Sequence, residues 1–86
     1  ENVVFNVIRK NGEVRYVLVG DKEVDFLQSG TAFEVKYKDA LRPEDLDNLT
    51  CLKGVKRRVM ITRSVSKVQD GIEIIPLHKF LREQGT

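Results

Sequence analysis

Residues 23–38 read EVDFLQSGTAFEVKYK, and this stretch predicts two β-strands joined by a tight turn. Apolar and polar residues alternate along both arms, which is the period of a half-buried strand. Ser29-Gly30 supplies the turn, because glycine adopts a positive φ without steric cost. If those two residues form the whole loop, counting outward from it pairs Phe26 with Phe33.

The same register places two carboxylates side by side, with Asp25 directly opposite Glu34. Opposed Cβ atoms lie roughly 5 Å apart, and at an effective dielectric of about 20 the two charges repel by roughly 3 kcal/mol. A cation would offset this repulsion, and two hard oxygen ligands suit Mg²⁺. Lys36 follows Glu34 by two positions and projects from the same face. The group predicts metal-assisted hydrolysis of a phosphodiester, with the lysine orienting the nucleophile or steadying developing charge.

A structural interpretation of the hairpin stays open beside the functional one. A hairpin with one apolar face and one charged face is common in small domains. Glu23 opposite Lys36 would then be a surface ion pair worth less than about 1 kcal/mol.

Length and composition predict one small domain covering residues 1–86. The single cysteine, Cys51, excludes an internal disulfide, fits a reducing cytoplasm and is expected to lie in the core. No apolar run approaches the roughly 18 residues of a membrane span, so no membrane partner is expected. A net charge of +2 permits a nucleic-acid partner. The chain begins with Glu1 rather than Met, which predicts a piece excised from a longer protein.

Hydrophobic periodicity and breakers predict an α/β fold in which helices flank a mixed five-stranded sheet, with its strands in order 1-2-3-4-5. Strand two is expected to run antiparallel to its neighbours, and a crossover helix to make the fourth strand parallel to the third. The predicted helices cover 1–11, 43–53 and 77–83; the strands cover 13–19, the two arms of 23–38, 57–63 and 71–75, with a polar loop over 64–70.

Two further features are candidates for function. On the helix predicted over 1–11, Glu1 extends the stripe that faces the sheet, although a first-turn Glu is also favoured by the helix dipole. The densest basic cluster could contact phosphates, or it could be a solvated helix end. That cluster consists of Lys53, Lys56, Arg57 and Arg58.

Glu1, Asp25 and the run Glu34-Val35-Lys36 resemble, in order and placement, the motif of the PD-(D/E)xK nuclease superfamily. The resemblance implies a three-layer α/β/α restriction-endonuclease-like fold and Mg²⁺-dependent cleavage of DNA. It implies that Asp25, Glu34 and the Val35 carbonyl hold the metal, that Lys36 positions the water, and that Glu1 assists at a second metal or as a base. Val24 stands where the motif name has Pro, and Tyr37 follows Lys36 where many active members carry a polar residue.

The runs ENVVF, EVDF, FEVKY and IIPLHKFL, at residues 1–5, 23–26, 33–37 and 74–81, are similar to the C-terminal domain of archaeal and bacterial AAA+-type ATPases. That resemblance implies an ATPase module of the same chain as a partner, although residues 1–86 contain no phosphate-binding loop of the Gly-x-x-x-x-Gly-Lys-Ser/Thr type. Two hypotheses follow: a Mg²⁺-dependent endonuclease, or a catalytically silent module that binds DNA or a partner, or regulates the ATPase. The oligomeric state is left open.

Overall fold

The computed structural model describes residues 9–10, 12, 15–19 and 22–84, with side chains at 9–10, 12 and 26–83. The helix predicted over 1–11, and with it Glu1, therefore lies almost entirely outside the described residues. No helix in the described part is long and apolar enough to cross a membrane.

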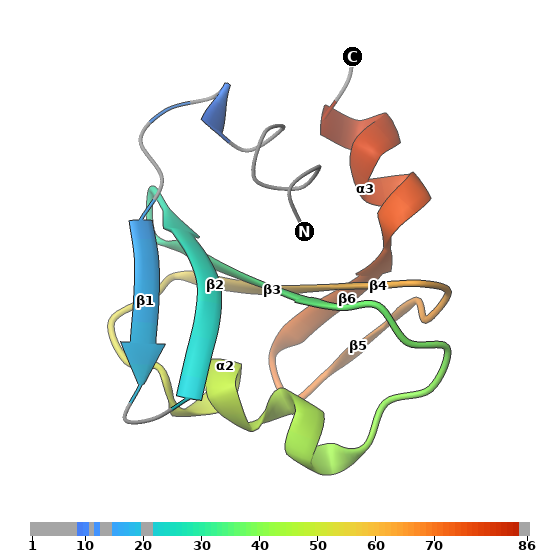
Figure 1. Cartoon of the computed structure of the whole chain (residues 1–86), viewed down its shortest axis with the longest axis horizontal. Coiled ribbons are helices and arrows are strands. Elements are labelled where there is room, and N and C mark those ends of the chain that lie inside the picture. The colour runs from blue at the N-terminus through green and yellow to red at the C-terminus, as the bar shows by residue number, and fades with distance from the viewer. Residues whose placement is uncertain (1–8, 11, 13–14, 20–21, 85–86) are drawn as a thin grey trace.

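Six strands and three helical segments make up the described part of the chain (Figure 1). In chain order they are β1 Arg15–Val19, β2 Lys22–Gln28, β3 Thr31–Lys36, the 3-10 helix η1 Pro43–Leu46, α2 Asp47–Cys51, β4 Arg57–Thr62, β5 Lys67–Gln69, β6 Ile72–Pro76 and α3 Leu77–Gln84.

All six described strands belong to one mixed sheet, in the order β1-β2-β3-β4-β6-β5. As predicted, β2 runs antiparallel to β1 and β3, and β4 is parallel to β3. The chain passes through η1 and α2 between β3 and β4, so the predicted strand–helix–strand connection is confirmed.

The predicted strand order is wrong at the far edge of the sheet. Residues 67–69, expected within a polar loop, form β5, which pairs with β6 rather than leaving β6 at the edge. Asp70 and Gly71, with φ of 53° and 76°, form the tight turn that folds β5 back onto β6. β6 takes the inner place because Ile72 and Ile74 are buried, whereas Val68 of β5 is 73% exposed.

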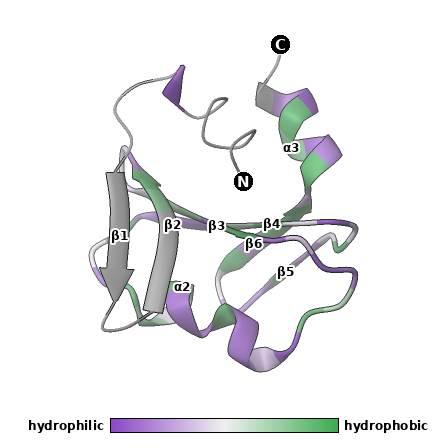
Figure 2. Cartoon of the chain, in the orientation of Figure 1, coloured by the Kyte–Doolittle hydropathy of each residue, from purple (hydrophilic) through white to green (hydrophobic). Residues whose placement is uncertain are grey.

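Helices cover both faces of the sheet, with α3 on one side and η1 and α2 on the other (Figure 1). Under α3 lies a cluster of Phe26, Phe33, Val59, Ile61 and Phe80. Under η1 and α2 lies a second cluster of Ala32, Leu46, Leu49, Met60, Ile72 and Ile74. In Figure 2, α3 carries hydrophobic and hydrophilic residues along the same turns, as an amphipathic helix that covers a sheet must. The α/β class with helices on both faces is therefore confirmed.

The turn between β2 and β3 has the predicted length. Ser29 and Gly30 have φ of 49° and 83°, which is the two-residue geometry that follows the twist of a hairpin. Phe26 pairs with Phe33, so the predicted register is confirmed where the two strands are hydrogen-bonded.

The helix predicted over 43–53 is divided and shorter than expected. The 3-10 segment η1 precedes α2, which ends at Cys51. The guanidinium of Arg58 donates to the carbonyls of Leu49 at 2.7 Å and Leu52 at 2.6 Å, which satisfies acceptors at the end of α2. Because Leu49 takes the inward position, Cys51 is exposed, and the expectation of a core cysteine is wrong.

Candidate active site on strand β3

Glu34 is the deeply buried carboxylate of β3, with 2% of its surface exposed. Strand alternation places it on the same face as Ala32, beneath η1 and α2, and its partner position on β4 is Met60. Those neighbours are apolar and buried. A charged carboxylate in such surroundings costs several kcal/mol unless other groups compensate it, so Glu34 is an unusual residue for a purely structural strand.

Lys36 supplies one compensating charge, as the i, i+2 spacing predicted. Its Nζ lies 3.4 Å from Oε2 of Glu34, and a third of the Lys36 side chain (33%) is exposed. The ammonium therefore stands between a buried acid and solvent. A group in that position can contact a phosphate from outside while staying near the carboxylate.

Asp45 of η1 forms a second acid–base pair on the same side of the sheet. Its carboxylate accepts the backbone N–H of Arg42 at 2.8 Å and the Nζ of Lys38 at 3.0 Å, and the residue is 8% exposed. The Arg42 N–H lowers the pKa of Asp45 from its ordinary value of 3.8, and the charges of Lys38 and Lys36 add to this against the opposing effect of burial. Because the Lys36 charge acts on Asp45, the two pairs form one electrostatic group.

Asp25 lies on β2, the strand next to β3, as predicted. β2 pairs with β1 through residues 22–24 and Leu27, with an irregularity in register between them, and it pairs with β3 through Phe26, Leu27 and Gln28. Asp25 lies where the register between β1 and β2 shifts, one residue before the pair of Phe26 with Phe33. Its side chain lies outside the described residues, so its position directly opposite Glu34 stays a prediction.

The backbone of Val35 faces the strand that carries Asp25. The carbonyl of Gly30 accepts the N–H groups of Lys56 and Arg57, which lie on the β4 side of β3. Carbonyls of consecutive strand residues point to opposite neighbours, so the carbonyl of Val35 points toward β2.

The donor set suits a hard cation in part. Glu34 and the Val35 carbonyl carry oxygen atoms of the type that Mg²⁺ prefers as ligands. Asp45 is engaged by Lys38 and a backbone N–H. Among the described side chains, no three His, Cys, Asp or Glu residues are grouped so that they could hold a metal ion.

The predicted basic cluster separates into two kinds of residue. Arg57 donates to Glu73 at 2.5 and 2.7 Å, and Arg58 caps α2, so both guanidinium groups serve intramolecular contacts. Lys53 and Lys56 are exposed in the connection between α2 and β4.

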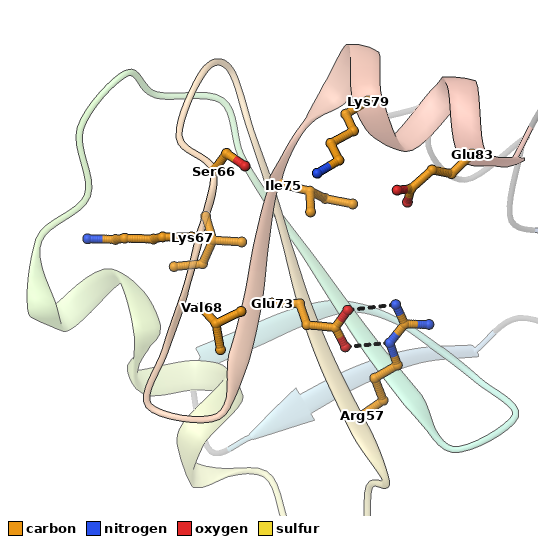
Figure 3. A pocket seen from close by; sticks show the side chains of 9 residues that line it. Arg57, Ser66, Lys67, Val68, Glu73, Ile75, Lys79 and Glu83 are labelled. Atoms are coloured by element: carbon orange, nitrogen blue, oxygen red, sulfur yellow. Dashed lines mark hydrogen bonds and ion pairs between the residues drawn. The ribbon is translucent and has the colours of Figure 1, made fainter.

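A pocket of about 280 Å³ opens on the α3 face, where β5 and β6 meet α3 (Figure 3). The side chains of Lys79 and Ser66 point toward it, and the dashed contacts in Figure 3 join Arg57 and Glu73. Glu34 lies on the opposite face of the sheet, so this pocket is separate from the predicted site. Its full lining is Arg57, Ser66, Lys67, Val68, Glu73, Ile74, Ile75, Lys79 and Glu83.

Sequence reasoning missed Asp45 and Lys38 as members of this electrostatic group. An acidic residue at the start of a predicted helix, such as Asp45, is favoured by the helix dipole and is usually exposed. Its spacing of three from Arg42 does match a carboxylate that reaches back to the residue before the helix. That signal could have found the backbone contact, but not the burial.

The sequence matches no protein-family model and no curated protein, and the fold matches no solved structure. We therefore infer the function from the geometry of the chain itself.

Proposed function

We propose that this chain is a nuclease-like domain of restriction-endonuclease type that hydrolyses phosphodiester bonds in DNA with the help of Mg²⁺. The observation that carries the proposal is the buried Glu34, 3.4 Å from the Lys36 ammonium, on a strand directly beside the one that carries Asp25. Acid and amine converge there at a cost to the fold, which is typical of residues retained for chemistry.

The arrangement of the sheet supports the same assignment. Three antiparallel strands precede a helical crossover and a strand parallel to the third. That order is the one implied by the PD-(D/E)xK resemblance, and the Glu-x-Lys run falls on the third strand, as that resemblance requires.

Each residue then has a defined role. Asp25, Glu34 and the carbonyl of Val35 would hold Mg²⁺, which when bound polarises the phosphate and makes water more acidic. Lys36, close to Glu34 and partly exposed, would orient the attacking water and stabilise negative charge on the phosphate oxygens. Glu1, which lies outside the described residues, would assist at a second metal or as a base.

The direct test is cleavage of supercoiled plasmid and of branched DNA, with Mg²⁺ or with a chelator. Lys36→Ala and Glu34→Gln should each lower cleavage by at least about a hundredfold, since both remove groups that act on the reacting phosphate. Lys79→Ala is the matched control, because Lys79 is an exposed lysine of α3 that belongs to neither acid–base pair. Cleavage that survives Lys36→Ala would refute the mechanism.

A metal titration tests the ligand set without cleavage. Chemical shifts of the Glu34 and Val35 amides should change and saturate at millimolar Mg²⁺ or Mn²⁺ or below, and Asp25→Ala should abolish the change. An unaltered response in Asp25→Ala would remove Asp25 from the site.

A second candidate function is binding to DNA, or regulation of an ATPase module of the same chain, without cleavage. The observation that favours it is that Lys36 and Lys38 each lie within 3.4 Å of a carboxylate of this chain. Such pairs can be purely structural and can present an electropositive surface. Mg²⁺-independent DNA binding without any cleavage would select this function.

A further inference from the structure

Tyr37 is an aromatic side chain left in solvent at the carboxyl end of β3. It is 60% exposed and is one of two large hydrophobic residues that are exposed in the described part of the chain. The guanidinium carbon of Arg63 lies over its ring, 5.7 Å from the ring centroid. Lys36 and Thr62 are the last paired residues of β3 and β4, so Tyr37 and Arg63 follow side by side.

The two loops that carry this pair are tied together. The N–H of Arg63 donates to the carbonyl of Lys38 at 3.1 Å. Asp39 lies 3.8 Å from Nε of Arg63 and accepts the hydroxyl of Ser64 at 2.8 Å. These contacts hold the guanidinium beside the ring. The aromatic ring is therefore supported by hydrogen bonds and an ion pair at the carboxyl ends of β3 and β4.

In two of the three ion pairs near the carboxyl ends of β3 and β4, the acid is buried and the base is more exposed. The acids Glu34 and Asp45 are 2% and 8% exposed, whereas their partners Lys36 and Lys38 are 33% and 48% exposed. The side chain of Arg63 is 60% exposed. Asp39, beside Arg63, is the exception because it is 65% exposed. The three cations and three acids are therefore equal in number, and the two lysines are the charges that face solvent without an equally exposed acid.

We propose that the surface at the carboxyl ends of β3 and β4, formed by Lys36, Tyr37, Lys38 and Arg63, binds single-stranded DNA. One unpaired base stacks on Tyr37, and the adjoining phosphates contact the two lysines. An aromatic ring flanked by cations is how sequence-tolerant proteins hold single strands, because every base has a π-face. In a duplex those faces are covered by neighbouring bases, so the ring selects unpaired DNA. The inference rests on the proposed function and names its substrate class.

The test is binding of a fluorescein-labelled oligothymidine strand of about 20 nucleotides, compared with a duplex of equal length, by fluorescence anisotropy in a chelator. The chelator prevents cleavage, so binding is measured apart from chemistry. The 86-residue chain should prefer the single strand. Tyr37→Ala should weaken that binding by about tenfold, the usual loss of one stacked base, while Tyr37→Phe should bind like the unaltered chain.

Val68→Ala is the matched control, because Val68 is the other exposed large hydrophobic residue and lies on the edge strand β5. Arg63→Gln should weaken the single-strand complex and leave duplex binding as it was. Equal binding by Tyr37→Ala and Val68→Ala would overturn the inference, as would a preference for the duplex. Tyr37-dependent binding without cleavage in Mg²⁺ would leave this inference standing and remove the nuclease, whereas Lys36-dependent cleavage of DNA that ignores Tyr37 would do the reverse.

Discussion

Glu34 on β3 and Glu73 on β6 lie on opposite faces of one sheet, and each has a basic side chain beside it. Glu73 is 40% exposed and meets Arg57 through two hydrogen bonds of 2.5 and 2.7 Å. Glu34 is 2% exposed and has its Lys36 contact at 3.4 Å. The shorter contacts therefore belong to Glu73, the acid whose charged form loses less hydration in the folded chain.

This contrast separates an exposed acid with close basic contacts from a buried acid. The N–H groups of Arg57 lower the pKa of Glu73, and Arg57 in turn has a raised pKa, so each stabilises the charged form of the other. An exposed pair of this kind ties β4 to β6 and adds a little stability. The buried Glu34 lies farther from its lysine and loses more hydration on folding.

The largest expected effect comes from removing the basic partner of each acid. Lys36→Met should lower the free energy of unfolding by about 2 kcal/mol, because the buried carboxylate loses the nearby ammonium. Arg57→Met should cost less than about 1 kcal/mol, because Glu73 is exposed to water. Urea unfolding at neutral pH measures both. Equal losses of unfolding free energy in the two variants would mean that the burial of Glu34 does not increase the effect of removing its basic partner.

Removing the acids themselves should give effects of opposite sign. Glu34→Gln should raise the free energy of unfolding by about 1 kcal/mol without metal, since the buried charge disappears and Lys36 can turn to solvent. Glu73→Gln should lower it by less than about 1 kcal/mol. Combining Glu34→Gln with Lys36→Met should recover most of the loss of the single lysine variant. A stability loss in Glu34→Gln would make Glu34 a structural residue.

The stability that the exposed Glu73–Arg57 pair contributes should depend on pH, and this effect should be smaller than those of the substitutions above. Because the folded pKa of Glu73 is lowered from 4.5, its pair adds stability above about pH 4.5, and this is lost as the pH falls through the lowered value. The difference between the unaltered chain and Arg57→Met, a few tenths of a kcal/mol at neutral pH, should therefore approach zero in acid. Unfolding curves across the acid range measure it, and a difference that grows in acid would contradict the pairing.

The smallest expected effect concerns the turn that sets the register of β2 against β3. Ser29 adopts a φ of 49°, which asparagine tolerates better than serine. Ser29→Asn should raise the free energy of unfolding by a few tenths of a kcal/mol and leave the Glu34–Lys36 pair in place. The turn at Asp70-Gly71 already has a favoured residue at the equivalent position, so Asp70→Asn should change little. A shifted pattern of amide contacts across β2 and β3 in Ser29→Asn would contradict this prediction, because asparagine would then not preserve the two-residue turn.

Several elements could be predicted because local chemistry specifies them. Strand alternation over 23–38, the Ser29-Gly30 turn and the amphipathic pattern of 77–83 each act through neighbouring residues, and the structure agrees with them. β5 was not predicted because Lys67, Val68 and Gln69, with a single apolar residue among them, are too short a run to be distinguished from a loop. Their strand exists because the adjacent β6 offers a hydrogen-bonding edge.

The candidate site likewise has some features that the local sequence determines and others that it does not. The spacing of Glu34 and Lys36 fixes that they share a face of β3, since side chains two apart on a strand point the same way. Burial of Glu34 and of Asp45, the second pair with Lys38 and the bracing of Tyr37 by Arg63 depend on η1 and on the loop after β4, which lie far along the chain. Sequence alone thus determined which groups are adjacent along a strand, and the tertiary structure decided which of them face water, because depth is a property of the packed layers and not of any one segment.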